Sequence, residues 1–107
     1  MRYICESVIQ NLNALPAYAV CAAIINTKSI QQNYKYIQNI VSDNVTCSAV
    51  VKADAYGFGA KQVSMALQNV GCSEFFVATV DEGIEIRDVL STKSKVFSCG
   101  RKCKVHP

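Results

Sequence analysis

The sequence predicts an α/β fold in which parallel strands alternate with helices. Apolar runs typical of buried strands occur at 45–52, 74–79 and 95–98, and helical periodicity fills the segments between them. A strand–helix–strand series pairs its strands in parallel through right-handed crossovers. The chain has 107 residues, 50% of them hydrophobic and 18% charged, which is enough for one packed domain and too short for two.

The first elements follow a polar-rich leader of low order, residues 1–16. Residues 18–25 are apolar and typical of a strand. Asn26 or Thr27 can then cap a helix over about 28–41. Four apolar side chains recur on one face of that helix, which we expect to be buried: Ile30, Tyr34, Ile37 and Val41.

The segment 45–52 is apolar at successive positions, as in a strand covered by helices on both faces or a strand of a barrel. A loop containing two glycines follows over 53–59. A second helix is predicted over about 60–70, and Gly71 stands at its expected end.

The segment 74–79 is predicted to be a buried strand. Thr79 and Glu82 then fit a capping box, in which the hydroxyl and the carboxylate each bind a free backbone N–H of the first helical turn. The helix that they open runs to about Leu90, and residues 95–98 can start another strand.

The formal net charge of +3 comes from the C-terminal end. Residues 1–92 hold six basic and eight acidic side chains, whereas five basic side chains and no acid follow from Lys93 onward. A basic face interleaved with aromatic residues is absent from residues 1–92. We therefore expect no nucleic-acid partner.

No run of residues approaches the ~20 apolar positions that a membrane-spanning helix needs. The run 17–25 has the length of a signal-peptide core, but Asn11, Asn13 and Glu6 precede it and no small-residue cleavage pattern follows. We expect no membrane partner and no secretory signal.

Six cysteines are many for this length and would suggest a disulfide framework in a secreted protein. Cys21 and Cys47, however, lie in apolar, strand-like runs, and Cys72 lies just past a helix end. Cysteine acts as a small buried hydrophobe in such places. We therefore expect reduced thiols in a cytoplasmic protein.

Cys99, Cys103 and His106 offer three zinc ligands near the C-terminus. A structural zinc site usually needs four ligands, and this spacing matches no standard knuckle. No metal is therefore predicted, and residues 99–107 are expected to form an irregular basic tail.

The segment from Lys52 to Ala60 contains the candidate reactive residues of this sequence. A lysine that ends a buried strand is unusual, because burying an unpaired ammonium group is costly. The carboxyl end of a parallel strand is where α/β folds build their sites. Desolvation there favours a neutral amine, which can form a Schiff base with an aldehyde cofactor.

Two interpretations of this segment stay open from the residues alone. Lys52 can be a reactive amine, with the Tyr56 hydroxyl near an anion and with Gly57 and Gly59 allowing backbone close to a ligand. Alternatively, Lys52 only extends toward solvent from the strand end, and the glycines shape a turn.

The order of residues here resembles the pyridoxal 5′-phosphate (PLP) binding signature of alanine racemases. In that family a valine-rich strand runs into Lys-Ala-Asp/Asn-Ala-Tyr-Gly-x-Gly, and residues 49–59 match this pattern. The resemblance covers roughly residues 17–98. Three further segments fall at family-like positions: Asn33-Tyr34, the strand 75–79 and the helix 81–87.

The resemblance implies an isomerase that interconverts L- and D-alanine and supplies D-alanine for peptidoglycan. Lys52 would hold PLP as an internal aldimine and would also be one of two acid/base groups that exchange the α-proton. Tyr56 matches the tyrosine that contacts the cofactor phosphate. Asp54 stands where Asn or Asp is common, with loop structure as its expected role, and Phe58 replaces a common histidine.

The resemblance also implies a larger protein. The family's PLP-binding (β/α)8 TIM barrel takes about 250 residues, so 17–98 would be the N-terminal portion of an incomplete barrel, and 99–107 a tail that the family lacks. The second base, a tyrosine from the other subunit of a homodimer, and the arginines near the pyridine ring lie outside the matched residues. The strand 18–25 belongs with the family's C-terminal β-domain and would lack its partners. We therefore expect a truncated, inactive fragment.

Two alternatives accompany this interpretation. One is a non-catalytic PLP-binding module, although such modules are complete barrels whose local signature differs from Tyr-Gly-x-Gly. The other is a non-functional gene remnant whose product does not fold stably.

Overall fold

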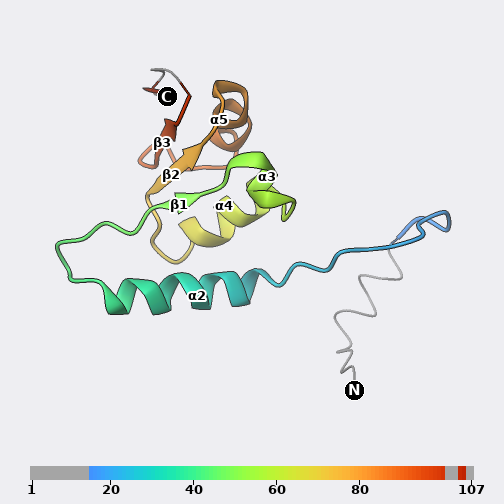
Figure 1. The fold of residues 1–107 in the computed structure, drawn as a ribbon, viewed down its shortest axis with the longest axis horizontal. Coiled ribbons are helices and arrows are strands. Elements are labelled where there is room, and N and C mark those ends of the chain that lie inside the picture. The colour runs from blue at the N-terminus through green and yellow to red at the C-terminus, as the bar shows by residue number, and fades with distance from the viewer. Residues whose placement is uncertain (1–14, 101–103, 106–107) are drawn as a thin grey trace.

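The computed structural model describes residues 15–100 and 104–105. A small sheet with helices beside it makes up the body, and an extended segment leads into α2 from one side (Figure 1). The elements in chain order are α2 (Thr27–Ile40), β1 (Ala49–Val50), α3 (Lys52–Tyr56), α4 (Ala60–Gln68), β2 (Glu74–Val77), α5 (Val80–Arg87), β3 (Lys95–Ser98) and β4 (Lys104–Val105).

The sheet has the order β1-β2-β3-β4. β1 pairs with β2 and β2 with β3 in parallel, whereas β4 is antiparallel to β3. Val50 lies opposite Phe76, which lies opposite Phe97. The parallel α/β arrangement predicted from the alternation of elements is therefore confirmed for the first three strands.

The hydrophobic core lies on one face of this sheet. Side chains at alternate positions of the strands are buried against α4 and α5, among them Phe75 and Val77, both with no exposed surface. The opposite face is uncovered in the part of the chain that the structure describes. There Val50 is 53% exposed, and the rings of Phe76 and Phe97 stack with their centroids 4.9 Å apart. Of the two arrangements predicted for the strand 45–52, cover by helices on both faces is not found within the described residues, whereas one helix-covered face agrees with a strand of a barrel.

The helix α2 begins one residue before its predicted start, and Asn26 caps it by accepting a hydrogen bond from the Ser29 N–H at 3.1 Å. Tyr34 is buried, and its hydroxyl donates to the Cys47 carbonyl oxygen at 2.9 Å, which ties α2 to the chain entering β1. Ile37, expected to be buried, is 50% exposed, because this end of the helix face has no cover within the described residues.

The capping box predicted at the start of α5 is confirmed. The Thr79 hydroxyl accepts from the Glu82 N–H at 3.2 Å, and the Glu82 carboxylate accepts from the Thr79 N–H at 3.2 Å. The helix ends at Arg87 rather than at Leu90. The Arg87 guanidinium donates to the carbonyl oxygens of Ser91 and Ser94, which stabilises the turn beyond the helix.

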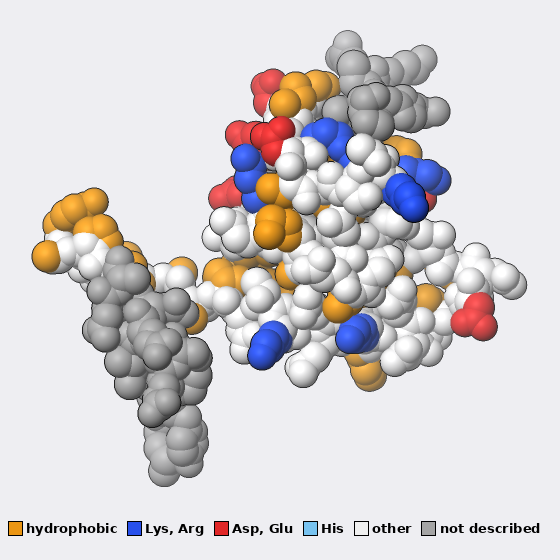
Figure 2. Space-filling view, turned by 180° about the vertical axis from the view of Figure 1, so that it is seen from behind, with side chains coloured by type: hydrophobic (Ala, Val, Ile, Leu, Met, Phe, Trp, Pro, Cys, Tyr) orange, Lys and Arg blue, Asp and Glu red, His pale blue; other side chains and the backbone are white. Residues whose placement is uncertain are grey.

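The strand predicted at 18–25 was wrong. The segment is irregular, with a turn at 17–18, and lies apart from the sheet (Figure 1). Its apolar side chains other than Ile25 are exposed, with Tyr18 at 85% and Val20 at 99%. Figure 2 shows apolar atoms on this segment, away from the body. A strand needs a hydrogen-bonding neighbour, and the described residues provide none here. Cys21, expected to be buried, is exposed for the same reason, whereas Cys72 is buried as predicted.

Two further boundaries differ from the predictions. The strand 45–52 shrinks to Ala49–Val50, the residues that pair with β2 in the ladder. The Val51 N–H still donates to the Phe76 carbonyl oxygen at 2.8 Å, but its backbone has left the extended conformation. The tail was expected to be irregular, yet the backbone of Lys104–Val105 pairs with β3. The expected leader lies outside the described residues except for 15–16. Among the described helices, none combines the length and the apolar character that crossing a membrane requires.

Candidate functional site

The backbone that follows β1 forms a left-handed turn. Residues 53–59 were predicted to be a loop, but Lys52–Tyr56 form the short element α3, in which Ala53 to Tyr56 all have φ between +53° and +55°. Left-handed helical geometry costs an L-residue about 1–2 kcal/mol, so a run of four such residues is strained. Strain of this kind occurs preferentially at functional sites.

Hydrogen bonds around the far end of the turn hold this geometry. The Gly57 and Gly59 N–H groups donate to the Asp54 carbonyl oxygen at 3.1 and 2.9 Å. The Asp54 carboxylate accepts from the Ala60 N–H, the first of α4, at 2.8 Å. Asp54 thus joins the turn to the next helix, whereas the sequence suggested only loop structure for it.

Glu82 holds the near end of the same turn. Its Oε1 accepts from the Ala53 N–H at 2.8 Å, and its Oε2 accepts from the Ala78 N–H at 2.8 Å. Hydrogen bonds from the Ala78 and Ala53 N–H groups, with the nearby Lys52 charge contributing less, lower the pKa of the Glu82 carboxyl below its usual range. The sequence identified Glu82 only as a helix cap, because the contact with Ala53 spans 29 residues.

Lys52 stands at the first position of this turn and is half-buried. Its ammonium has no ion pair within residues 15–100; the ion pairs found there join Lys61 to Asp88 and Lys95 to Glu74. The Lys52 charge acts on the Glu82 carboxylate, whose pKa it helps to lower. This position fits a lysine kept for a ligand.

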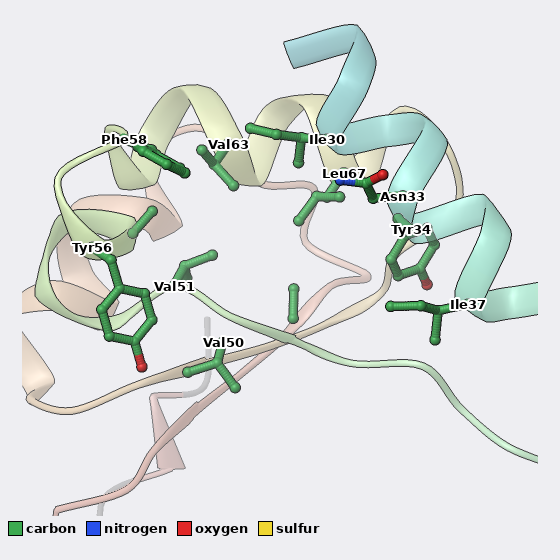
Figure 3. A pocket seen from close by; sticks show the side chains of 12 residues that line it. Ile30, Asn33, Tyr34, Ile37, Val50, Val51, Tyr56, Phe58, Val63 and Leu67 are labelled. Atoms are coloured by element: carbon green, nitrogen blue, oxygen red, sulfur yellow. The ribbon is translucent and has the colours of Figure 1, made fainter. Parts of the chain in front are cut away.

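Tyr56 ends the turn and is 64% exposed. In Figure 3 its ring points to the side of β1 on which Val50 lies, while Val51 points toward α4. Tyr56 and Val50 thus lie on the same side of β1, and both line the hollow described below. The two residues that the sequence singled out, Lys52 and Tyr56, begin and end one strained turn at the carboxyl end of β1.

The two glycines of the signature are explained by backbone conformation. Gly57 and Gly59 have φ of +85° and +91°. A Cβ on Gly57 would meet no atom within 4 Å, so its left-handed φ, and not crowding, accounts for glycine there. A Cβ on Gly59 would also approach the Gln62 Oε1 to 2.6 Å.

An apolar hollow of about 320 Å³ lies nearby, between α2, β1 and the α3–α4 turn (Figure 3). Ile30, Tyr34 and Ile37 line it from α2, and Phe58 and Val63 from the other side. Tyr56 lines this hollow and Lys52 does not, so the hollow adjoins the candidate site on the Tyr56 side.

Residues 15–100 contain no group of three His, Cys, Asp or Glu side chains placed to hold a metal. Cys99 is an exposed free thiol, and its two possible companion ligands, Cys103 and His106, lie outside the described residues.

Comparison with known sequences finds one protein family. The family model for the alanine racemase N-terminal domain matches residues 25–100. Alanine racemase of Rickettsia prowazekii is 44% identical over 73 residues, which are 68% of this chain and 18% of that protein. Alanine racemase of Rhodospirillum rubrum is 35% identical over 79 residues, 74% of this chain and 21% of that protein. The chain thus spans about a fifth of the length of these relatives.

Solved structures give the same result. A crystal structure of alanine racemase from Bartonella henselae, with covalently bound pyridoxal phosphate, has a TM-score of 0.65 and 39% identity, over 67% of this chain and 20% of that chain. Alanine racemase from E. faecalis has a TM-score of 0.68 and 29% identity, over 74% of this chain and 21% of that one. Because the matched residues include the strained turn with its lysine and both helices around it, this chain belongs to the alanine racemase family.

Proposed function

We propose that this chain provides the PLP-binding lysine of an alanine racemase, and that Lys52 is that lysine. The observation that carries the proposal is the position of Lys52, a half-buried residue with no ion pair within residues 15–100 that stands at the head of a strained turn. The residues present fit the cofactor chemically. An amine is what the aldehyde of PLP requires, and the exposed Tyr56 hydroxyl on the same turn can donate a hydrogen bond to a phosphate oxygen.

PLP, when bound, supplies the electron sink that makes the α-hydrogen of an amino acid acidic. The role of this chain is to bind and orient PLP and to move one proton. Lys52 takes or returns that proton at Nζ on one face of the substrate, and Tyr56 fixes the phosphate end so that the geometry is kept. The proposed substrate is alanine, as in the relatives' names.

Racemisation needs acid/base groups on both faces of the α-carbon, and Lys52 provides one. In this proposal residues 17–98 are the N-terminal portion of a PLP-binding (β/α)8 barrel. The second base and the remaining phosphate contacts come from outside them, within a homodimer. The protein works in the cytoplasm and supplies D-alanine for peptidoglycan. The 107 residues alone hold the cofactor without turning over alanine.

The test is to mix the purified chain with PLP, reduce with borohydride and map the labelled peptide by mass spectrometry. We expect label on Lys52 that disappears in Lys52→Ala but persists in Lys61→Ala, a control lysine whose side chain is 45% exposed. Equal labelling of the Lys52→Ala chain would contradict the assignment.

The same preparation separates the alternatives. Label on Lys52 without conversion of L- to D-alanine supports a chain that binds the cofactor and needs further residues for turnover. Conversion by the 107 residues alone would show that no further base is needed. A chain that takes no label and has the circular dichroism spectrum of an unfolded polypeptide would be the product of a gene remnant.

A further inference from the structure

We infer that Glu82 is the positioning residue of this site: its carboxylate holds the peptide bond that follows Lys52 and so sets the direction of the lysine side chain. The inference rests on the proposed function of Lys52 as the cofactor lysine. Glu82 lies 30 positions further along the chain, on α5, and touches neither cofactor nor substrate in this role.

The contact is made at the peptide bond next to the lysine. The Ala53 N–H belongs to the peptide unit that begins at the Lys52 carbonyl, and it donates to Glu82 Oε1 at 2.8 Å. Fixing the plane of that unit restricts ψ of Lys52 and thereby the direction of its Cα–Cβ bond. A charged acceptor makes such a bond shorter and stronger than a neutral one.

The strain of the turn is the reason that such a restraint is needed. The left-handed run begins at Ala53, with φ +53° and ψ +46°. Asp54 holds the far end of the run through the Ala60 N–H, but Glu82 is the side chain that binds its first N–H. Without this bond we expect Ala53 to relax toward ordinary backbone conformations and the Lys52 amine to sample several directions.

The two carboxylate oxygens have separate partners. Oε1 binds Ala53, and Oε2 binds the N–H groups of Ala78 and Thr79 at the end of β2 and the start of α5. Glu82 therefore connects the turn after β1 to the end of β2. The hydrogen bonds from Ala78 and Ala53 keep the pKa of Glu82 low, so the carboxylate is charged at neutral pH.

This division of the two oxygens allows a selective test. Glu82→Gln keeps one acceptor oxygen, which can serve the helix cap, and presents an NH₂ group to the Ala53 N–H, with which it cannot pair. Thr79→Ala is the matched control. It removes the other half of the capping box, the bond from the Glu82 N–H, and leaves the bond to Ala53 in place.

The experiment compares the 107-residue wild-type, Glu82→Gln and Thr79→Ala chains in two measurements. The first is the rate of borohydride-fixed PLP labelling at Lys52. The second, made without cofactor, is amide hydrogen exchange at Ala53 by NMR. We expect Glu82→Gln to slow labelling about tenfold or more and to speed Ala53 exchange by a similar factor, as loss of a hydrogen bond to a charged group predicts. Thr79→Ala should stay within about twofold of wild type in both.

The inference would be overturned if Glu82→Gln labelled Lys52 and exchanged the Ala53 amide at wild-type rates. It would also be overturned if Thr79→Ala slowed labelling and sped Ala53 exchange as much as Glu82→Gln does, because Glu82 would then act only as a helix cap. If the wild-type chain takes no label, the proposed function fails, and exchange at Ala53 decides by itself whether Glu82 holds the turn. Should Glu82→Gln lower stability, Glu82→Asp provides a second variant. It keeps the charge but is one methylene too short to reach Ala53, and the same slowing is expected.

Discussion

Single residues carry the unusual features of this site. Four consecutive non-glycine residues from Ala53 to Tyr56 adopt left-handed conformations, between a lysine and a glycine. Two carboxylates hold the run at its ends, Glu82 at the first N–H and Asp54 at the start of the next helix. Asp54 belongs to the turn itself, whereas Glu82 binds it from α5, so the strained conformation depends in part on its surroundings.

The first prediction concerns Gly57, whose φ of +85° places it in the left-handed region at the end of α3. Gly57→Ala should lower the free energy of unfolding by about 1 kcal/mol, since a Cβ is strained at this φ even though no atom lies in its way. Urea unfolding followed by circular dichroism measures the loss. Asn69→Ala, at ordinary right-handed angles, is the control and should stay within about 0.5 kcal/mol.

The second prediction concerns acid. The pKa of Glu82 is lowered in the folded chain, chiefly by the Ala78 and Ala53 N–H groups, so its contribution to stability is present above its ordinary value of 4.5. That contribution is lost as the pH falls through the lower, folded-state pKa. In urea titrations from about pH 5 to about pH 3, Glu82→Gln should therefore lose less stability than wild type.

Glu85→Gln removes one carboxylate from the same helix at an exposed position and serves as the matched control. Its free energy of unfolding should fall between about pH 5 and about pH 3 by as much as that of wild type. An equal loss of unfolding free energy on acidification in wild type and Glu82→Gln would mean that the ionised carboxylate of Glu82 contributes nothing to folding.

Side-chain hydrogen bonds connect helices to the residues at the ends of strands. The Tyr34 hydroxyl joins α2 to the chain before β1 by donating to the Cys47 carbonyl oxygen. Burial, with a smaller effect of the neighbouring Cys72, raises the pKa of Tyr34, so the hydroxyl stays a donor at neutral pH. The Glu82 carboxylate likewise links the ends of β1 and β2 to the start of α5.

The third prediction tests the bond between α2 and β1. Tyr34→Phe should lower the free energy of unfolding by about 1 kcal/mol, because the Cys47 carbonyl loses its donor within the fold. Tyr36→Phe, whose ring is 69% exposed on the same helix, should change it by less than about 0.5 kcal/mol. Thermal unfolding of both variants provides the comparison, and equal melting temperatures would contradict the assigned role of the hydroxyl.

The whole molecule has one covered and one uncovered sheet face within its described residues. β1 is at the edge of the sheet, with Val50 half-exposed, and Phe76 and Phe97 continue this apolar face. The segment 15–25, which reaches away from the body, adds further exposed apolar side chains (Figures 1 and 2). Open edges and exposed apolar faces favour association with other chains.

The fourth prediction follows from this surface. Val50→Lys places a charge on the uncovered face and the free edge of β1, and should reduce self-association of the 107-residue chain, as measured by light scattering against concentration. Gln32→Lys adds the same charge at an exposed position of α2 and should leave association unchanged. A reduction of equal size in both variants would assign the effect to net charge.

Local patterns determined the kinds and order of the elements. The periodicity of α2 and α4, the capping box of Thr79 and Glu82, and the parallel order of the first three strands could be predicted, because each depends on neighbouring residues or on chain connectivity. The signature around Lys52 likewise predicted the family to which the chain belongs.

Only the tertiary structure decided the features that depend on distant partners. The left-handed turn at Ala53 is bonded to the Glu82 carboxylate from α5, and a local sequence pattern cannot predict a contact across 29 residues. The apolar segment 18–25 has the composition of a strand, yet it forms none, because a strand exists only where another backbone pairs with it. Composition determines what a segment can bury or bond, whereas the presence of a partner at the right place determines whether it does.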